Sequence, residues 1–403
     1  MSLTRGRILP FAVALVVLIA LVVLLVFAVR ACTSGSSDNS ADDGASSDVV
    51  VEDTRPRVSF VAVGDNVPND VLGEYADSQK GTKDDGEYDY SQLFSQIKPY
   101  VQAADLAYID QETHVGGNEL GVRGYPSFNT TDEMADAVVD AGFDLVASAT
   151  NHSYDWGPYG AVEHSRGVWN ALPVAFTGTA TNEDEAAKIP VVERNGMKFA
   201  LLSYTYGLNG YAKGDIPDYY VNIYDEERLT DDVKRAHEVA DVVVVAMHWG
   251  EENNSEPTDE EKRYAQLLAD LGVDVVLGSH PHIIQPMTWL NGKQGKNTLV
   301  CYSLGNFIMQ YDLPDRYENL EGMMSCDFVK SDDGTISIEN VKWTPLVYHG
   351  ESSEYAVWAV KDYSDALASR NPCFVKEKDP MTWMREESER IVNGLGNSFE
   401  IDA

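Results

Sequence analysis

Six apolar segments of the sequence run directly into residue types that commonly bind metals or transfer protons, and this pattern limits the fold more than any other feature. Each segment has the composition of a buried β-strand. The junctions are Val63-Gly64-Asp65, Ile109-Asp110-Gln111-Glu112, Thr150-Asn151-His152, Met247-His248-Trp249, Gly278-Ser279-His280-Pro281-His282 and Leu304-Gly305-Asn306. Ligands of open α/β sheets bind beyond the carboxyl ends of the strands. The pattern therefore predicts an α/β fold with a metal-assisted catalytic site where the strands end.

Segments with helical spacing of apolar residues alternate with these strands. They cover residues 91–101, 131–141, 160–172, 225–239 and 258–271. The turn signals Asn195-Gly196, Asn291-Gly292 and Asp333-Gly334 follow strand-like segments and predict β-hairpins. Because hairpins are combined with strand–helix–strand units, we expect mixed sheets.

The chain divides into four predicted regions. They are a membrane anchor over residues 1–30, a disordered stalk rich in Ser and Asp over 31–56, a folded domain over 57–350, and a C-terminal appendage of unknown role over 351–403. Within the appendage, residues 354–360 and 383–392 are expected to form a pair of helices that packs on the domain.

The anchor is predicted from residues 8–29, which carry no charge and are long enough to span a bilayer. Arg5 and Arg7 precede this segment and Arg30 alone follows it closely, so the positive-inside bias places the folded domain outside the cytoplasm. We therefore expect a single-pass protein of the cell membrane with an extracellular domain. Lipoprotein processing at Cys32 is the alternative, and Arg30, two residues before that cysteine, disfavours it.

The four cysteines are too few and too scattered for a disulfide framework or a cysteine zinc site. Cys301 lies in an apolar segment and is expected to be a small core residue. Cys326 and Cys373 are able to pair outside the cell, and the sequence leaves this open.

The charge balance excludes one class of partner. The chain has 65 acidic and 30 basic residues and a formal charge of −35. Nucleic acid is excluded because neutralising its phosphates requires clusters of Lys and Arg. An anionic substrate needs a locally positive pocket, and a bound divalent cation supplies one.

The segment Asn151-His152-x-x-Asp155 contains residue types for three roles. The Asn151 carbonyl oxygen can ligate a metal, the His152 imidazole can donate a proton, and Asp155 can orient that imidazole. The alternative for His152 is an ordinary loop histidine that bonds only to the backbone.

The pair His280-Pro281-His282 is the sharpest single motif. A residue before proline favours extended backbone, and extended backbone puts residues two apart on one face. Both imidazoles are therefore expected at one site with His248, Asp65 and Glu112. Such mixed ligands suit one or two divalent ions of manganese, iron or zinc better than calcium. Because ligands must lose protons, affinity should fall as the pH drops through the histidine range near about 6.5.

These segments resemble the CapA family of poly-γ-glutamate capsule-biosynthesis proteins, which is related to the calcineurin-like metallophosphoesterases. The matching segments run in family order between about residues 57 and 350. They are Val63-Gly64-Asp65, Asp110-Gln111-Glu112, Asn151-His152-Ser153-Tyr154-Asp155-Trp156-Gly157, His248-Trp249-Gly250-Glu251-Glu252, Gly278-Ser279-His280-Pro281-His282-Ile283-Ile284-Gln285 and Tyr302-Ser303-Leu304-Gly305-Asn306-Phe307. The resemblance implies a four-layer α/β/β/α sandwich of two mixed sheets, with helices outside.

The resemblance also implies roles for the candidate residues. The implied metal ligands are Asp65, Glu112, Asn151, His248, His280 and His282. Glu112 would bridge two ions, and His152 is the implied catalytic histidine. Val67 is a departure, since a phosphoesterase usually has a histidine at this position. Asp110 stands where an asparagine is usual, and it either compensates for the missing ligand or is a turn residue.

Two functions are compatible with these observations. The first is a membrane-anchored extracellular hydrolase that uses a metal to cleave a phosphoester or an amide. The resemblance implies that it acts in the synthesis, export or anchoring of an anionic envelope polymer such as poly-γ-glutamate, with other capsule-biosynthesis membrane proteins as partners. The alternative is a non-catalytic envelope scaffold or polymer-binding subunit, which Val67 favours. A secreted nucleotidase or phosphodiesterase is a third option that rests on fold analogy alone.

Overall fold

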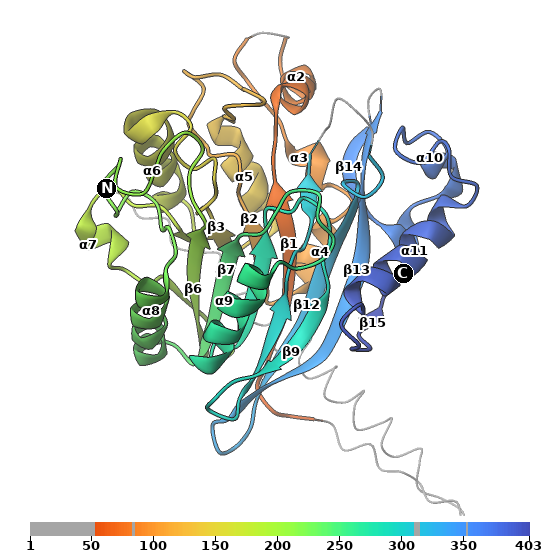
Figure 1. The fold of residues 1–403 in the computed structure, drawn as a ribbon. Helices are drawn as coiled ribbons and strands as arrows, with labels where there is room; N and C mark the ends of the chain where they lie inside the picture. The colour runs from red at the N-terminus through yellow and green to blue at the C-terminus, as the bar shows by residue number, and fades with distance from the viewer. Residues whose placement is uncertain (1–52, 83–84, 310–314, 352–353) are drawn as a thin grey trace, which may run out of the picture. The chain divides into compact units, whose positions relative to one another are not determined.

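The computed structural model describes residues 53–82, 85–309, 315–351 and 354–403 (Figure 1). The predicted anchor over residues 1–30 and residues 31–52 of the predicted stalk lie outside the described residues. Residues Thr54–Ala403 form one compact unit. Within the described part, no helix is both long and apolar enough to cross a membrane.

Two mixed β-sheets form the centre of this unit. The first sheet runs in the order β14 (Glu354–Ala359), β13 (Ile336–Glu351), β12 (Leu320–Lys330), β1 (Arg57–Asn66), β2 (Leu106–Asp110), β3 (Leu145–Ala147) and β4 (Ala175–Thr177). The short strands β11 (Asn306–Ile308) and β15 (Glu400–Ile401) pair with β1 and β13. The second sheet runs in the order β5 (Val191–Arg194), β6 (Met197–Thr205), β7 (Val242–His248), β8 (Val275–Ser279), β10 (Asn297–Cys301) and β9 (Met287–Asn291). The prediction of mixed sheets in an α/β fold is confirmed.

The two sheets pack against each other through one face of each. The inner residues of β1 alternate with outer ones, so that Val58, Phe60 and Ala62 join the core between the sheets. Phe199 from the second sheet packs against Phe328 of the first, with ring centroids 5.1 Å apart. Because both faces of these strands are buried, the sequence reads as nearly continuous apolar runs.

Helices flank the two sheets, most of them on the outer faces, whereas those of the C-terminal segment contribute buried residues to the core between the sheets. The larger ones are α2 (Asp70–Gln79), α5 (Asp132–Ala141), α6 (His164–Asn170), α8 (Glu226–Val239), α9 (Asp259–Asp270) and α11 (Pro380–Val392). The shorter ones are α3 (Ser91–Phe94), α4 (Lys98–Ala103), η1 (Pro158–Glu163), α7 (Glu183–Ala186), η2 (Val360–Asp362) and α10 (Asp365–Ala368). Met134 and Val138 of α5 pack on the first sheet. Leu229 and Leu268, from α8 and α9, pack on the second.

The C-terminal segment packs against the sheets. Residues 354–359 form strand β14, antiparallel to β13, so the expectation of a helix over 354–360 was wrong. The alternating side chains of this strand face two different cores, with Val357 in one and Trp358 against the other. The second expected helix is present as α11, whose residue Met384 is fully buried between the sheets and this helix.

The cysteines of the described part form no disulfide. Cys301 and Cys326 are buried core residues and Cys373 is half-buried, and all three are free thiols. The pairing of Cys326 with Cys373 that the sequence left open is therefore not formed in this structure.

The parallel strands of both sheets end at the same side of the molecule (Figure 1). β1, β2 and β3 run parallel in the first sheet, and β6, β7 and β8 run parallel in the second. At this side the sheets touch through polar groups, because the backbone N–H of His280 donates to Asp65 Oδ2 over 3.0 Å. The fold thus brings the predicted junctions together.

Candidate metal centre

Six of the strand-end side chains meet in one buried cluster. Asp65 is the penultimate residue of β1, Asp110 ends β2, His248 ends β7, and His280 directly follows β8. The ligand atoms of Asp65, Glu112 and His282 lie within 4.8 Å of one another, and so do those of Glu112, His248 and His280. Glu112 belongs to both groups, which is the arrangement of a carboxylate shared by two metal ions.

The first group is built around His282. Its Nδ1 lies 3.4 Å from Asp65 Oδ2 and 3.9 Å from Glu112 Oε2. Asn306 Oδ1 lies 3.0 Å from the same nitrogen. Val67 is 1% exposed and offers no side-chain ligand, so the departure noted in the sequence leaves this group with three ligands from the predicted set.

The second group contains Asn151. His248 Nε2 lies 2.8 Å from Asn151 Oδ1 and 3.8 Å from Glu112 Oε1. The His280 ring is 4.8 Å from the His248 ring. The group therefore offers a carboxylate, an amide oxygen and two imidazoles, a donor set that suits a divalent transition metal.

Asp110, whose role the sequence left open, is buried behind His248. Its Oδ2 lies 3.2 Å from His248 Nδ1, and Ser279 Oγ lies 3.0 Å from the same nitrogen. Both bonds fix the ring so that Nε2 points toward Asn151 and Glu112. A carboxylate that orients a ligand histidine in this way is a common feature of metal sites. Ligand atoms of Asp110, Asp65 and His248 also lie within 4.8 Å of one another.

Several atoms of the cluster lack a hydrogen-bond partner among the described residues. They are Asp65 Oδ1, both carboxylate oxygens of Glu112, and His280 Nδ1. Burial raises the pKa of Asp65 and of Glu112, and it raises that of Asp110 to about 6. Buried carboxylates without partners destabilise a fold, and a bound divalent cation removes that cost. The residues present therefore fit one or two divalent ions.

The three histidines differ in charge before any cation binds. Burial lowers the pKa of His248 to about 3 and that of His280 to about 2, so both are neutral near pH 7. Burial also acts to lower the pKa of His282, but Glu112 and Asp65 outweigh it and raise this pKa to about 10. His282 is therefore a cation in the metal-free protein and must lose a proton to become a ligand.

The histidine pair reaches the cluster by a backbone path that differs from the prediction. His280 has φ 93° and His282 has φ 60°, so neither is extended. Such left-handed backbone is uncommon outside glycine and costs about 1–3 kcal/mol per residue. The surrounding contacts hold it, since the His280 N–H donates to Asp65. The expectation of extended geometry was wrong, although both rings still reach one site.

His152 and Asp155 form a pair beside the metal cluster. His152 Nδ1 donates to Asp155 Oδ2 over 2.7 Å, and the same oxygen accepts the Phe128 N–H over 2.9 Å. The Phe128 ring packs edge-on against His152 at 4.7 Å. The imidazole is thereby fixed with Nε2 turned away from Asp155, as a proton donor requires.

Asn209 is a site residue that the sequence reasoning missed. Its Nδ2 lies 3.3 Å from His152 Nε2, and its backbone N–H donates to Asn151 O over 3.0 Å. It lies in a loop after β6, and its local sequence carries no motif. Asn306 and Ser279 stood at predicted strand ends, so the strand-end pattern was the signal that could have identified them.

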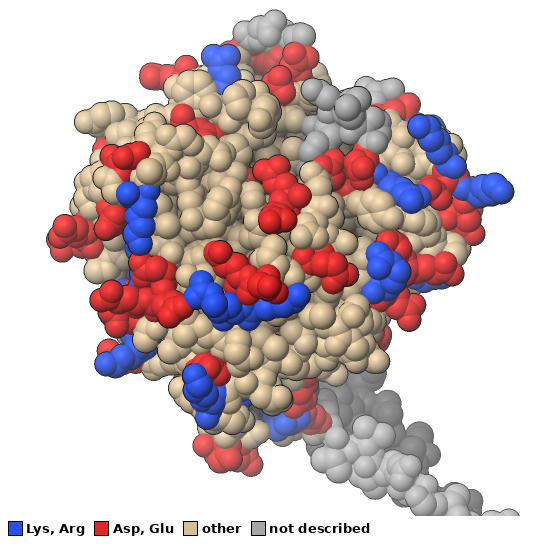
Figure 2. Space-filling view, viewed as in Figure 1, with Lys and Arg blue, Asp and Glu red and all other residues tan. Residues whose placement is uncertain are grey.

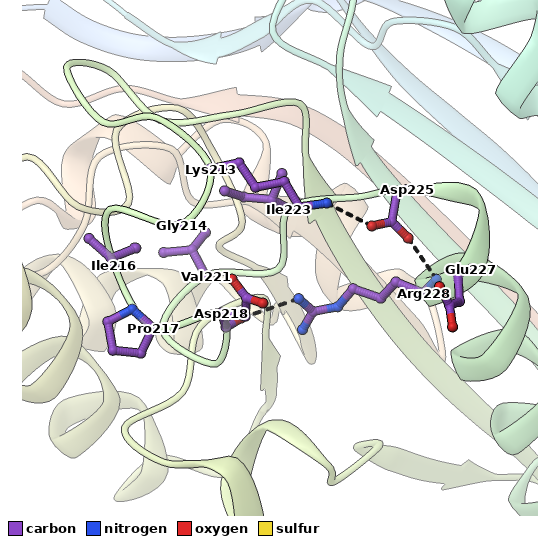
Figure 3. A pocket seen from close by; sticks show the side chains of 10 residues that line it. All are labelled: Lys213, Gly214, Ile216, Pro217, Asp218, Val221, Ile223, Asp225, Glu227 and Arg228. Carbon is purple, nitrogen blue, oxygen red and sulfur yellow. Dashed lines mark hydrogen bonds and ion pairs between the residues drawn. The ribbon is translucent and has the colours of Figure 1, made fainter.

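A separate cavity of about 220 Å³ lies in the loop that leads into α8 (Figure 3). None of its lining residues belongs to the metal cluster. Both basic side chains that line it already have acidic partners, because Lys213 pairs with Asp225 at 2.8 Å and Arg228 pairs with Asp232 at 3.7 Å. The described lining of this cavity therefore offers no unpaired cation to an anionic ligand.

Sequence comparison assigns the chain to a group of known proteins. Residues 59–311 match the sequence profile of a family described as bacterial capsule synthesis protein PGA_cap. The PGA biosynthesis protein CapA of Bacillus subtilis (strain 168) is 28% identical over 326 residues, covering 74% of this chain and 82% of that protein. The capsule biosynthesis protein CapA of Bacillus anthracis is 27% identical over 235 residues, covering 55% of this chain and 49% of that protein.

Solved structures with a similar arrangement are more distant. NAD nucleotidase (NadN) of Haemophilus influenzae has 11% identity and a TM-score of 0.43, covering 86% of this chain and 64% of that one. A putative 5'-nucleotidase from Staphylococcus aureus has 12% identity and a TM-score of 0.41, covering 83% of this chain and 59% of that one.

Proposed function

The chain belongs to the bacterial capsule synthesis protein PGA_cap family, and we propose that it is a metal-dependent hydrolase acting on an anionic envelope polymer such as poly-γ-glutamate. The observation that carries the hydrolase is the position of Glu112 between two groups of ligands, with the His152–Asp155 pair alongside. The polymer is supported by the names of the relatives from two Bacillus species.

The residues divide into those that hold the cation and those that move a proton. Asp65, Glu112 and His282 would hold one divalent ion, and Glu112, Asn151, His248 and His280 a second. Such ions supply Lewis acidity and an activated water for attack on a phosphoester or an amide. His152 acts as the general acid that protonates the leaving group, and Asp155 stabilises the protonated imidazole.

A bound cation would also reduce the electrostatic repulsion between this acidic protein and an acidic substrate. The chain carries a formal charge of −35, and the cluster itself contains three buried carboxylates. A polyanion would be repelled by this protein unless a positive centre lay at the site. A metal-loaded centre provides that charge only where the reaction occurs.

A substrate screen of the full-length protein tests this proposal. Protein loaded with manganese, iron or zinc is offered phosphoesters and γ-glutamyl peptides. We expect hydrolysis of one class by the wild type and its loss in His248→Ala, while His237→Ala, a change in an exposed histidine of α8, keeps the activity. Protein that binds metal but hydrolyses neither class would contradict the proposal.

A non-catalytic scaffold or polymer-binding subunit is the second candidate. Val67 favours it, because a buried valine stands where the first ion would have a histidine ligand. The presence of the His152–Asp155 pair and of Glu112 favours the hydrolase. Binding of poly-γ-glutamate without shortening of the polymer would identify the scaffold.

We also propose that the protein is anchored in the cell membrane by residues 1–30, with its folded domain extracellular. The support is the uncharged segment 8–29 with Arg5 and Arg7 before it. Other membrane proteins of capsule biosynthesis are the proposed partners, and they would meet this domain at the outer surface.

A further inference from the structure

The solvent side of the centre lies at His282, which is half-buried while the other predicted ligands are buried. Asp65, Glu112, His248 and His280 are all at most 4% exposed and approach from the strand ends. The first ion would receive Asp65, Glu112 and His282, and Val67 adds no ligand. A divalent transition metal commonly takes four or more ligands, so a further protein ligand fits here.

The loop after β7 is exposed and reaches the histidine pair. It begins at His248, turns at Gly250 with φ 87°, and turns again at Asn253 with φ 61°. A side chain at Gly250 is excluded, because its Cβ would lie 2.7 Å from the Glu261 carboxyl group. This turn therefore requires glycine at position 250.

Backbone hydrogen bonds hold this loop against the histidine pair. The Trp249 N–H donates to Ser279 O over 3.1 Å, and the Asn253 N–H donates to Pro281 O over 2.9 Å. The two donors, Trp249 and Asn253, lie on either side of Glu251 and Glu252 in the chain. The two acceptors are the ends of the segment from Ser279 to Pro281. The loop is consequently held in place beside His280 and His282.

Glu252 is the loop residue that comes within ligand distance. A carboxylate oxygen of Glu252 and ring nitrogens of His280 and His282 lie within 4.8 Å of one another. Glu252 is exposed, whereas His280 is 4% exposed and its Nδ1 lacks a hydrogen-bond partner among the described residues. An exposed carboxylate thus lies near a buried imidazole whose Nδ1 has no hydrogen-bond partner among the described residues.

We propose that Glu252 is an additional metal ligand, which closes the centre from the solvent side and supplements the ion held by Asp65 and His282. This inference rests on the metal centre of the proposed function. Glu252 would supply the first ion with a carboxylate from the loop after β7. In related phosphoesterases, a histidine at the position of Val67 is expected to be the ligand instead.

The neighbouring glutamate provides a matched control. Glu251→Gln and Glu252→Gln remove the same charge from adjacent exposed positions, and of the two only Glu252 belongs to the ligand groups. Full-length protein is stripped with a chelator, and manganese or zinc is titrated by calorimetry. We expect Glu252→Gln to weaken the binding of one ion roughly 10- to 100-fold, and Glu251→Gln to change it less than about twofold.

The outcomes separate the two proposals. Equal affinities for Glu252→Gln and Glu251→Gln, with tight binding by the wild type, would overturn the role of Glu252 and leave the metal centre intact. A wild-type protein that binds neither metal would instead overturn the proposed function. Melting curves of the metal-free variants serve as the folding check, and they should coincide because both glutamates are exposed.

Discussion

In the proposed hydrolase, His152 would protonate the leaving group, and it lies outside the candidate ligand groups. Its ring is fixed by Asp155 and Phe128, and it lies next to Asn151 in the chain. We predict that His152→Ala leaves metal affinity nearly unchanged and lowers the hydrolytic rate by roughly 10²- to 10⁴-fold, the range of a general acid. Calorimetry and initial rates measure the two effects. Loss of metal together with activity would make His152 a ligand instead.

The pKa of His282 determines how metal binding responds to pH. Because Glu112 and Asp65 raise this pKa to about 10, the metal-free protein holds a proton on His282 throughout the neutral range. Binding displaces this proton, so apparent affinity should weaken about tenfold for each unit of pH decrease between about 9 and 7. The sequence alone predicted a change only near about pH 6.5. A dissociation constant that is flat above pH 7 would show that His282 titrates as an ordinary histidine.

The gathering of the candidate ligands in one cluster could be predicted from the sequence, but the geometry of several site residues could not. Asp65, Glu112 and His248 follow apolar strands, and parallel strands in a common core bring their ends together. The left-handed backbone of His280 depends on a long-range bond to Asp65, which no local pattern encodes. Asn209 reaches His152 through a loop whose path only the folded chain defines.

At the scale of elements, boundaries with local chemical signals were predicted well. α9 begins at the Thr258–Glu261 capping box, and α5 ends at Gly142 with φ 109°. The hairpins at Asn195-Gly196 and Asn291-Gly292 join antiparallel strands as expected. The expected helix over 91–101 is instead two short helices, α3 and α4. α4 begins at Lys98 with proline in its first turn, and proline lacks the N–H that a continuous helix requires there.

Strand β14 shows where a local pattern is insufficient. Its side chains alternate between two cores, and it is recognised as a strand only by pairing with β13. A short apolar segment of this kind fits either a helix or a strand until its partner is known.

The C-terminal segment should contribute directly to stability. Phe374 is fully buried in the core between the sheets, and the adjacent Val375 is 58% exposed. We predict that Phe374→Ala lowers the free energy of unfolding by about 3–5 kcal/mol, the usual cost of removing a buried phenyl ring. Val375→Ala is the control and should change it by less than about 0.5 kcal/mol. Denaturant titration measures both, and equal small effects would show that this segment is only loosely attached.

At the scale of the molecule, acidic side chains are spread over the face seen in Figure 2, and Lys and Arg lie mostly beside them. Such a surface favours cations and repels polyanions, with a range set by ionic strength. In the proposed function, this charge would concentrate the metal at the protein and would leave recognition of an anionic polymer to the metal-loaded centre.

Membrane attachment is predicted to depend on the N-terminal segment alone. Within the described part no helix is able to cross a bilayer, while residues 8–29 are uncharged and long enough. We expect the full chain to sediment with membranes and a version that starts at residue 53 to remain in the supernatant. Sedimentation of the shorter version would point to attachment through a partner or through the folded domain.

The central claim is that strand ends from two sheets build a centre for a divalent transition metal. Elemental analysis of freshly purified full-length protein, followed by metal add-back and thermal melting, tests it most directly. We predict at least one equivalent of manganese, iron or zinc, and a higher melting temperature when the stripped protein is reloaded. The double change His280→Ala with His282→Ala should abolish both effects while the far-ultraviolet spectrum stays native. A folded protein that contains no metal and gains no stability from any of the three ions would contradict the claim.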